Sequence, residues 1–408
     1  REHHAMSGPT HIIVGAGQAG AWASVSMRQA GFAGRILVIG EEPCRPYERP
    51  PLSKTMLTVD PEPGVAYFHD AAKYAALRIE FILGTPVLFL DATSRRIELG
   101  DGRTLAYDRL LLATGGRARR LGIPGGERAL VLRTLEHARA LRHRLLHARR
   151  VVCIGAGVIG LEIAASARAR GAHVTVLEAA PSPMGRVVSP DGARFIADLH
   201  ARAGVDLRCG VAIEALERAA DGGENVICGD NAVFSADLVI AGVGMERHLA
   251  LAEQAGLEID GGVVVDAHGR TSVDGVYAAG DIAAFPHRLF GRLRLESWRH
   301  AQNHGIAVGR AMADEPVAYD DIPWFWTDQH GVNLQITGIP TLAARTVIRG
   351  ADGFVAVHLA EDGTVVGVTA ADNPREIRAG TALIEARARP DIGQLADPAL
   401  PLRGLIPR

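Results

Sequence analysis

The first clear pattern in the chain is a short apolar run that changes into a helical repeat. Residues Ile12–Val14 are uniformly apolar, as in a buried parallel strand, and a helical spacing of apolar positions follows to about Ala30. A second apolar run, Arg35–Ile39, is followed closely by the acidic residue Glu41. This order predicts a strand, a helix and a second parallel strand that together form one βαβ unit.

The turn between this first strand and the helix is rich in glycine. Gly15, Gly17 and Gly20 have the G-x-G-x-x-G spacing of a dinucleotide-binding turn. The first glycine permits the tight turn, the second lets the backbone approach a pyrophosphate, and the third lets the helix pack closely on the strand. Glu41 stands where an acid accepts hydrogen bonds from an adenosine ribose. An ordinary tight turn is the alternative for the glycines, and the full βαβ context makes it the weaker one.

The same pattern returns in the middle of the chain, after an arginine-rich segment that predicts a helix over Leu135–Arg150. An apolar strand leads into a second glycine-rich turn, a helix, and a strand that ends at Glu178. The glycines of this turn are Gly155, Gly157 and Gly160. One chain therefore carries two dinucleotide sites in tandem. Glu178 would bind a ribose 2′-hydroxyl and repel a 2′-phosphate, so the second site favours NADH over NADPH.

Short strands follow each unit, and two of them end in residues of interest. The apolar run Leu110–Ala113 is followed by Thr114, and an expected strand over Thr271–Ala279 is followed by Gly280 and Asp281. Small residues at the carboxyl end of a parallel strand lie where an open α/β sheet admits its ligand. Asp281 could there hold a ribityl or ribose hydroxyl. A further strand is expected over Ile259–Val265.

Two charged residues stand out for their chemistry. Lys54 and Lys73 are the only lysines in a chain with 44 lysines and arginines in total. A compact ammonium whose pKa moves on burial suits a site beside a redox ring, so we single out Lys54 and assign Lys73 to the surface. Ser53 is expected to cap the helix that follows. Glu162 is expected in the first turn of the helix that follows the second glycine-rich turn. Stabilisation by the helix dipole explains a carboxylate there as well as a functional role does.

Composition narrows the class of protein. The chain has 408 residues, a net charge of −2 and 48% hydrophobic residues, which predicts two or three globular domains and argues against a nucleic-acid surface. We expect neither a signal peptide nor a membrane span. Residues 1–6 resemble the remnant of an expression tag. The four cysteines lie far apart without a CxxC pair, which is typical of reduced thiols in a cytoplasmic protein, and the histidines show no metal-ligand spacing, so no metal site is expected.

Taken together, several motifs carry a family resemblance. They are RPPLSK at Arg49–Lys54, ATG at Thr114, GAGVIGLE at Gly155–Glu162, VYAAGD ending at Asp281, ESWRHAQNHG at Glu296–Gly305, WFWTDQHG at Trp324–Gly331 and ADPALPLR at Ala396–Arg403. The chain resembles the FAD-dependent pyridine nucleotide–disulfide reductase superfamily. More narrowly, it is similar to the NADH-dependent ferredoxin reductases of bacterial aromatic-ring dioxygenase and cytochrome P450 systems.

The resemblance implies an α/β fold with two tandem Rossmann-like dinucleotide-binding domains, as in glutathione reductase, and a C-terminal α+β domain. An FAD-binding domain would comprise residues 10–115 and 248–320, and an NADH-binding domain residues 116–247. The C-terminal domain would comprise residues 321–408. In this domain the sequence pattern predicts four strands and a helix over Pro374–Ala388.

The resemblance also implies roles for individual residues. FAD would be held by Gly15, Gly17, Gly20, Glu41, Arg49, Thr114 and Asp281, and NADH by Gly155, Gly157, Gly160 and Glu178. Lys54 and Glu162 would form a buried ion pair beside the flavin N5. Trp298 and Trp326 would lie near the isoalloxazine, and for each tryptophan plain packing in a core or interface is the alternative reading.

The expected reaction follows from these roles. Disulfide reductases need a cysteine pair against the flavin, and this sequence has no such pair. Electrons are therefore expected to leave the flavin directly and not by thiol exchange. We expect NADH to reduce FAD, and a separate [2Fe–2S] ferredoxin to take the electrons one at a time to an oxygenase, with a dioxygenase favoured over a P450. An NADH oxidase and an NADH-sensing flavoprotein similar to apoptosis-inducing factor remain alternatives. The protein is expected to be a monomer or a weak homodimer.

Overall fold

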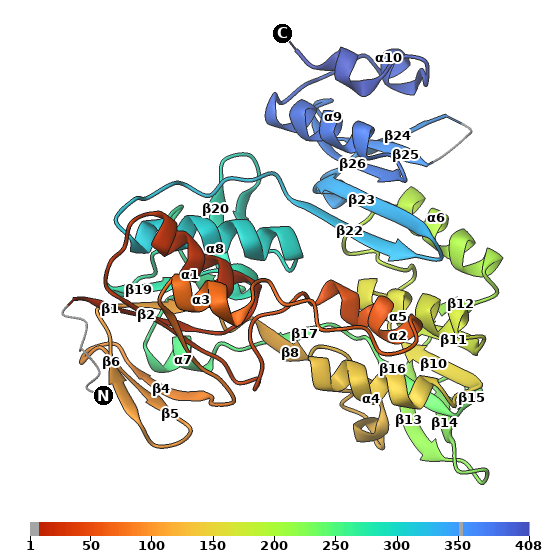
Figure 1. The fold of residues 1–408 in the computed structure, drawn as a ribbon. Coiled ribbons are helices and arrows are strands. Elements are labelled where there is room, and N and C mark those ends of the chain that lie inside the picture. The colour runs from red at the N-terminus through yellow and green to blue at the C-terminus, as the bar shows by residue number, and fades with distance from the viewer. Residues whose placement is uncertain (1–7, 351–353, 408) are drawn as a thin grey trace. The chain divides into compact units, whose positions relative to one another are not determined.

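The computed structural model describes residues 8–350 and 354–407, so the expected tag remnant at residues 1–6 lies outside the described residues (Figure 1). Contacts divide the chain into two compact units. The first unit contains residues 8–48, Gly64–Arg117 and Glu246–Asp321. The second contains Arg49–Pro63, Ala118–Met245 and the chain from Ile322 onward. The division into three domains stays a prediction, and each unit is described by itself below.

A five-stranded parallel sheet forms the centre of the first unit. Its strand order is β19 (Val276–Ala278), β7 (Arg109–Leu112), β1 (Thr10–Val14), β2 (Arg35–Ile39) and β3 (Ile79–Ile82). Helices α1 (Gln18–Gln29), α3 (Ala71–Ala76) and α8 (Trp298–Met312) belong to the same unit, as does α7 (Ala250–Gln254). The strands β1 and β2 therefore confirm the first predicted βαβ unit, with Ile12 paired to Leu37.

Helices α1 and α8 pack unusually closely because two glycines of α8 face α1. A Cβ atom on Gly305 would lie 2.4 Å from the carbonyl oxygen of Ala19, and one on Gly309 would lie 2.4 Å from that of Ala23. The Ser26 hydroxyl donates a hydrogen bond across the same contact to the carbonyl of Ile306, at 3.0 Å. Larger side chains at either glycine would push the helices apart.

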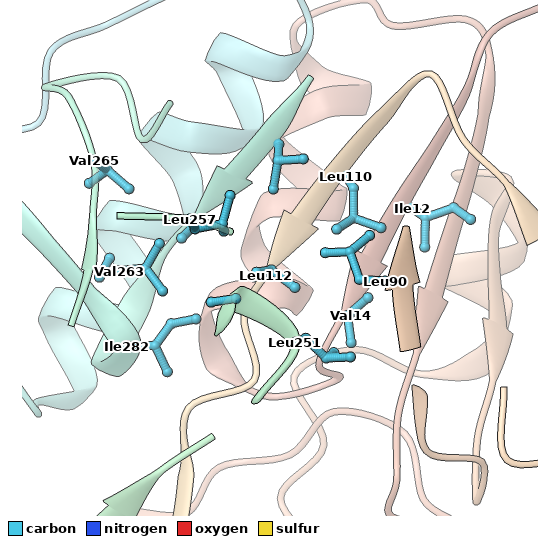
Figure 2. Packing of buried hydrophobic residues seen from close by; sticks show 14 of the residues in the cluster. Ile12, Val14, Leu90, Leu110, Leu112, Leu251, Leu257, Val263, Val265 and Ile282 are labelled. Carbon is cyan, nitrogen blue, oxygen red and sulfur yellow. The ribbon is translucent and has the colours of Figure 1, made fainter. Parts of the chain in front are cut away.

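Aliphatic side chains fill the space on one side of this sheet (Figure 2). Ile12 and Leu110, from neighbouring strands, are fully buried there and pack with Val263 and Ile282. Two smaller sheets complete the unit: the antiparallel β4 (Val87–Asp91), β5 (Arg96–Leu99) and β6 (Thr104–Ala106), and the set β18 (Val263–Val264), β20 (Ala283–His287) and β21 (Gly291–Leu293). The core therefore joins residues from all three segments of the unit.

The second unit contains another five-stranded parallel sheet. Its order is β12 (Asp206–Cys209), β11 (His173–Glu178), β10 (Arg150–Ile154), β16 (Leu238–Ala241) and β9 (Leu130–Val131). Its helices are α2 (Thr55–Thr58), α4 (Leu135–Leu145), α5 (Val158–Ala169) and α6 (Pro190–Arg202), and its antiparallel strands are β13 (Ile213–Arg218), β14 (Glu224–Cys228) and β15 (Val233–Ala236). The short strands β8 (Gly116–Ala118) and β17 (Met245–Arg247) lie where the chain passes between units.

The end of the chain adds an antiparallel sheet to the second unit. Its order is β22 (Trp324–Gln329), β23 (Val332–Gly338), β26 (Val365–Ala371), β25 (Val355–Leu359) and β24 (Arg345–Arg349), followed by helices α9 (Pro374–Glu385) and α10 (Ile392–Ala396). The four predicted strands are present, and the edge strand β24 was not predicted. The fold class is thus confirmed: two parallel sheets of α/β type and a C-terminal α+β part.

Several predicted elements are too long. The helix expected over Leu135–Arg150 ends at Leu145, because the chain must leave it before entering strand β10 at Arg150. The strands expected over Ile259–Val265 and Thr271–Ala279 shrink to two and three residues. Gly261 and Gly275 both have a positive φ, which bends the backbone out of the extended conformation. No helix in the described part of the chain combines the length and apolar character needed to cross a bilayer.

A buried histidine makes the stability of the second unit depend on pH. His358 on β25 is fully buried between the hydroxyls of Thr346 and Thr369, and burial lowers its pKa to about 4. The unfolded chain therefore binds a proton that the folded chain excludes between pH 6.5 and about 4. We expect this histidine alone to remove up to about 3 kcal/mol of unfolding free energy as the pH falls through that window.

Urea unfolding of wild type and His358→Gln at pH 7.0 and 4.5 measures the effect. The variant cannot ionise, so its loss of stability between the two pH values should be smaller than that of wild type. His173→Gln, at an exposed position on β11, is the matched control and should leave the pH slope unchanged. Equal slopes for wild type and His358→Gln would contradict the assignment.

Candidate functional site

Four predicted residues of the first unit meet at one edge of its parallel sheet. Asp281 follows β19, Thr114 follows β7, Gly15 follows β1 and Glu41 follows β2, and these four strands are consecutive neighbours in the sheet. Because the strands are parallel, their carboxyl ends share one edge. This edge is where open α/β sheets bind their ligands. Residues separated by more than 200 positions in the sequence therefore contribute to one candidate nucleotide site.

The glycine turn at the centre of this edge has the shape that a dinucleotide requires. Gly15 has a φ of +117°, and a Cβ atom there would lie 2.2 Å from the carbonyl oxygen of Ala113. A Cβ atom on Gly20 would lie 2.0 Å from the carbonyl oxygen of Gly15, so only glycine lets the helix approach the strand. Gly17, by contrast, faces open space, with no atom within 4 Å of its hypothetical Cβ.

The first amides of helix α1 are left free of side-chain caps. Gly17 occupies the N-cap position, and no side chain accepts a hydrogen bond from the first turn. Free backbone amides and the positive end of the helix dipole form an anion site, and the open space before Gly17 admits a pyrophosphate. The residues present therefore fit the diphosphate of FAD. Glu41 is exposed just beyond the end of β2, where it can accept hydrogen bonds from a ribose.

The loop that carries Asp281 is held by two buried histidines of helix α8. The amide of Gly280 donates to Nδ1 of His304 at 3.3 Å, and a ring nitrogen of His300 lies 3.4 Å from the carbonyl of Gly280. Burial lowers the pKa of His300 to about 4 and that of His304 well below its usual value, so both rings are neutral at pH 7. On the neighbouring strand end, the Thr114 hydroxyl donates to the carbonyl of His248 at 2.9 Å.

The second unit repeats this geometry with its own acid. Gly155 has a φ of +100°, and a Cβ atom on Gly160 would lie 2.1 Å from the carbonyl oxygen of Gly155. Helix α5 begins after Gly157 without a side-chain cap. The Glu178 carboxylate reaches back to the turn and accepts hydrogen bonds from the amides of Ala156 at 2.6 Å and Ala180 at 2.8 Å. Each carboxylate oxygen can accept a further hydrogen bond, so these residues fit the ribose and diphosphate of NADH.

A buried charge lies at a separate place in the second unit. Glu162 on helix α5 is 3% exposed, and Nζ of Lys54 donates to its Oε2 at 2.8 Å. The Ser53 hydroxyl donates to the same oxygen, and the Thr327 hydroxyl on β22 donates to Oε1 at 2.7 Å. Three donors from two segments, the loop with Ser53 and Lys54 and strand β22, thus surround one carboxylate. Such an arrangement stabilises a buried negative charge that an apolar interior would otherwise exclude.

Two expectations about this cluster are wrong. Ser53 does not cap helix α2, since Lys54 occupies the N-cap position and the serine hydroxyl is used by Glu162. Glu162 does not lie in the first turn of its helix, because α5 already begins at Val158 and no acidic residue occupies that turn. Helix-dipole stabilisation therefore does not explain the carboxylate, whereas its hydrogen-bond donors do. Lys73 is exposed on α3, as expected.

The two predicted tryptophans are half-buried, and the structure gives each a polar partner. Trp298 begins helix α8, and its indole nitrogen donates to the carboxylate of Glu48, whose pKa is raised by burial. Trp326 lies on β22, stacks on Trp324 with ring centroids 5.4 Å apart, and donates from its indole nitrogen to Asp328 at 3.1 Å. Their role at a flavin stays a prediction.

Arg49 belongs to the second unit by its contacts, although it was predicted to bind FAD. Its guanidinium donates to the carbonyl of Arg133 at 2.6 Å. Its predicted role toward FAD therefore rests on the resemblance alone.

Ser53 and Thr327 were missed as members of the site. A weak signal was present for Thr327, because polar Thr327 and Gln329 alternate along a strand and so point to one face, which the structure shows to be buried. No local signal pointed to Ser53, whose hydroxyl finds its partner 109 positions away. His200, fully buried on helix α6, was also missed, and it extends the same group of polar side chains.

The four cysteines are not joined in disulfides. Burial raises the pKa of Cys153 to about 12 and also raises the pKa values of Cys209 and Cys228. Within residues 8–350 and 354–407, no group of three or more histidine, cysteine, aspartate or glutamate side chains is arranged to hold a metal ion.

Comparison with known proteins gives a consistent result. Residues 9–305 match the family described as pyridine nucleotide-disulphide oxidoreductase, and residues 324–406 match the one described as reductase C-terminal. The chain is 39% identical to the ferredoxin–NAD(+) reductase component of the anthranilate 1,2-dioxygenase system of Burkholderia cepacia, and the match covers 98% of this chain and 99% of the relative.

Two solved structures are similar over nearly the whole chain. A ferredoxin reductase from Rhodopseudomonas palustris has a TM-score of 0.93 and 34% identity, covering 98% of this chain and 100% of the other. The covalent complex of putidaredoxin reductase with putidaredoxin contains a chain with a TM-score of 0.92 and 33% identity, with 98% of each chain covered.

The open space before helix α1 can be tested by filling it. Gly17→Ala adds a methyl group that meets no protein atom within 4 Å, so we expect the free energy of unfolding without FAD to change by less than ~0.5 kcal/mol. The same methyl group occupies the approach to the free amides, so FAD affinity should fall at least about tenfold. Flavin fluorescence titration of the apoprotein measures the affinity.

Gly64→Ala is the matched control, because its added methyl group also meets open space. It should leave both stability and FAD affinity unchanged. Wild-type FAD affinity in Gly17→Ala would mean that the diphosphate does not approach this turn.

Proposed function

Because the chain belongs to the pyridine nucleotide-disulphide oxidoreductase family, we propose that it carries electrons from NADH through bound FAD to a ferredoxin. The family works with FAD and NAD(H). The observation that carries the proposal is the duplicated nucleotide cradle, since each unit has one glycine turn, one free helix N-terminus and one acid. When bound, FAD can accept a hydride from NADH and release electrons singly.

The acidic and other side chains near each cradle indicate which of the two cofactors it binds. The cradle of the first unit has Asp281 and Thr114 at adjacent strand ends, which gives it polar groups for the larger cofactor, FAD. The cradle of the second unit has Glu178 at its turn, with alanines at 179 and 180 that offer no positive charge to a 2′-phosphate. We therefore assign NADH to the second cradle.

The state of the thiols supports direct transfer from the flavin to an outside acceptor. A thiolate is the reactive form of cysteine, and burial keeps Cys153 protonated at neutral pH by raising its pKa to about 12. Cys209 and Cys228 are shifted in the same direction. These three thiols are poor candidates for disulfide exchange with a substrate, and Cys44 is the one cysteine left, whereas exchange of this kind needs a pair. An electron-carrier protein is therefore the acceptor that the site supports best.

The acceptor we propose is a separate [2Fe–2S] ferredoxin that serves an oxygenase. A dioxygenase is favoured because the relative from Burkholderia cepacia is named as part of a dioxygenase system. The putidaredoxin complex supports a docked electron carrier as the mode of transfer. We propose a cytoplasmic protein, because cysteines that form no disulfide are typical of a reducing compartment. We also propose a monomer or weak homodimer.

Lys54 and Glu162 are the residues that we propose to act at the flavin N5. The ammonium and the carboxylate form a pair whose negative member is buried and whose positive member is 21% exposed. Removing one partner would leave the other charge uncompensated, at a cost of about 3–5 kcal/mol for a buried pair. We propose Trp298 and Trp326 as aromatic neighbours of the same ring.

A reconstituted electron-transfer assay tests the function. The FAD-loaded protein, NADH and a [2Fe–2S] ferredoxin should reduce cytochrome c at a rate that rises with ferredoxin concentration and is small without it. Each NADH should reduce two cytochromes. Stoichiometric hydrogen peroxide without ferredoxin would instead identify an NADH oxidase. A long-lived complex with NADH and no turnover would identify an NADH sensor.

Cofactor preference tests the second cradle separately. Glu178→Ala combined with Ala179→Arg removes the repelling carboxylate and adds a guanidinium at an exposed position. The ratio of kcat/KM for NADPH to that for NADH should rise roughly a hundredfold, corresponding to ~3 kcal/mol. Ala179→Arg alone, which retains the carboxylate, is the control and should shift the ratio much less. An unchanged ratio in the double variant would show that Glu178 does not face the ribose.

A further inference from the structure

The Glu162 carboxylate ends a chain of buried polar side chains that lies within the second unit. Thr327 donates to Glu162 and accepts from Nε2 of Gln329 at 3.0 Å. The carbonyl oxygen of the Gln329 side chain lies 2.8 Å from Nε2 of His200, and Nδ1 of His200 lies 3.2 Å from Nε2 of His330. Thr327, Gln329 and His200 are each at most 3% exposed. Four consecutive hydrogen bonds therefore link His330 to the carboxylate.

The direction of every bond in this chain follows from its last member. A carboxylate can only accept, so the Thr327 hydroxyl must give its proton to Glu162 and must accept from Gln329. Gln329 then presents its amino group to Thr327 and its oxygen to His200. His200 must carry its proton on Nε2, which leaves Nδ1 to accept from His330. All four bonds therefore point toward Glu162.

The two histidines are suited to this fixed arrangement because both are neutral. Burial lowers the pKa of His330 to about 4, and burial also lowers the pKa of His200. A neutral imidazole has one donor and one acceptor, which is what an interior link needs. A carboxamide does not readily accept and release a proton, so Gln329 interrupts any path for proton transfer. These hydrogen-bonded side chains therefore fix one another's orientation and do not conduct protons.

Lys54 can also adopt conformations in which its ammonium does not contact Glu162. Its side chain lines an open cavity of about 480 Å³, together with Ser166, Asp328 and His330. The lysine side chain is 21% exposed toward this cavity, and a long flexible lysine gains rotamer freedom by turning outward. A carboxylate fixed in one position favours the paired conformation, because less order is lost when the ammonium docks.

We propose that Thr327, Gln329 and His200 are positioning residues, whose aligned hydrogen bonds hold the Glu162 carboxylate in the one orientation that keeps Lys54 docked. This inference rests on the proposed role of the pair at the flavin, and it adds the residues that set the pair's geometry. The hydroxyl of Thr327 is the link that matters most, because it is the one that touches the carboxylate. Gln329 and His200 act through it.

The two lysines of the chain provide a direct readout. Protein labelled with ¹³C and ¹⁵N only in lysine gives one set of side-chain signals from Lys54 and one from exposed Lys73, which serves as an internal reference. In the FAD-loaded protein, Thr327→Val should move the Lys54 signals toward those of Lys73. Thr327→Ser keeps the hydroxyl and should restore the wild-type position.

Thr337→Val is the matched control. Thr337 is also a fully buried threonine of the same sheet, but its hydroxyl bonds to Thr381 at 2.8 Å, outside the chain that ends at Glu162. It should leave the Lys54 signals unchanged. If Thr327→Val does not fold, Gln329→Met replaces it, and a smaller movement in the same direction is expected. Lys54 signals that stay in place in the variant that folds would overturn the proposal.

Kinetics with ferricyanide as a one-electron acceptor separate this inference from the proposed function. Thr327→Val should lower kcat for NADH oxidation about tenfold and change the KM for NADH less than twofold, since the lost hydrogen bond to a charged group orients the pair and does not bind the nucleotide. A changed KM with unchanged kcat would contradict the positioning role. Wild-type protein that reduces ferricyanide but no ferredoxin would refute the proposed acceptor and leave the lysine spectra as a valid test of the network.

Discussion

The close approach of a helix to the strand before it is the constraint on which both nucleotide cradles depend. In each cradle a Cβ atom on the third glycine would clash with the carbonyl oxygen of the first glycine. The distance between these two atoms would be 2.0 Å for Gly20 and 2.1 Å for Gly160. Only a residue without a side chain satisfies this distance. The approach brings uncapped amides to the sheet edge, and the anion site, the neighbouring strand ends and the acids all take their positions from it.

A second constraint governs the charged site, where electrostatics replaces packing. A carboxylate that is 3% exposed cannot remain charged in an apolar interior unless donors replace its lost water. The fold supplies a lysine and a serine from one segment and a threonine from another. The threonine in turn accepts a hydrogen bond from Gln329. The requirement to satisfy one buried charge therefore ties α5, β22 and the segment before α2 together.

The sequence predicted the two cradles well because each is a local pattern. A βαβ unit, its glycines and its acid lie within about 30 consecutive residues, and turn geometry and apolar periodicity are properties of neighbouring positions. Element ends were less accurate: the helix expected to reach Arg150 stops at Leu145, since a helical spacing does not show where the chain must turn toward the next strand. The predicted cap at Ser53 failed because its hydroxyl has a distant partner with a full charge.

The amino-acid sequence by itself determined that this chain has two glycine-rich strand–turn–helix units, each followed by an acid, and its motifs identified the family that the comparisons then showed. The family motifs already implied the pairing of Lys54 with Glu162, which the structure shows. Only the tertiary structure decided that Ser53 joins this pair and that Thr327, Gln329 and His200 point their hydrogen bonds toward it. The physical reason is the separation along the sequence over which each kind of interaction acts. Backbone turns and periodicity act between neighbours, whereas a buried charge draws its donors from whatever segments the fold brings within about 3 Å, and no local pattern records that choice.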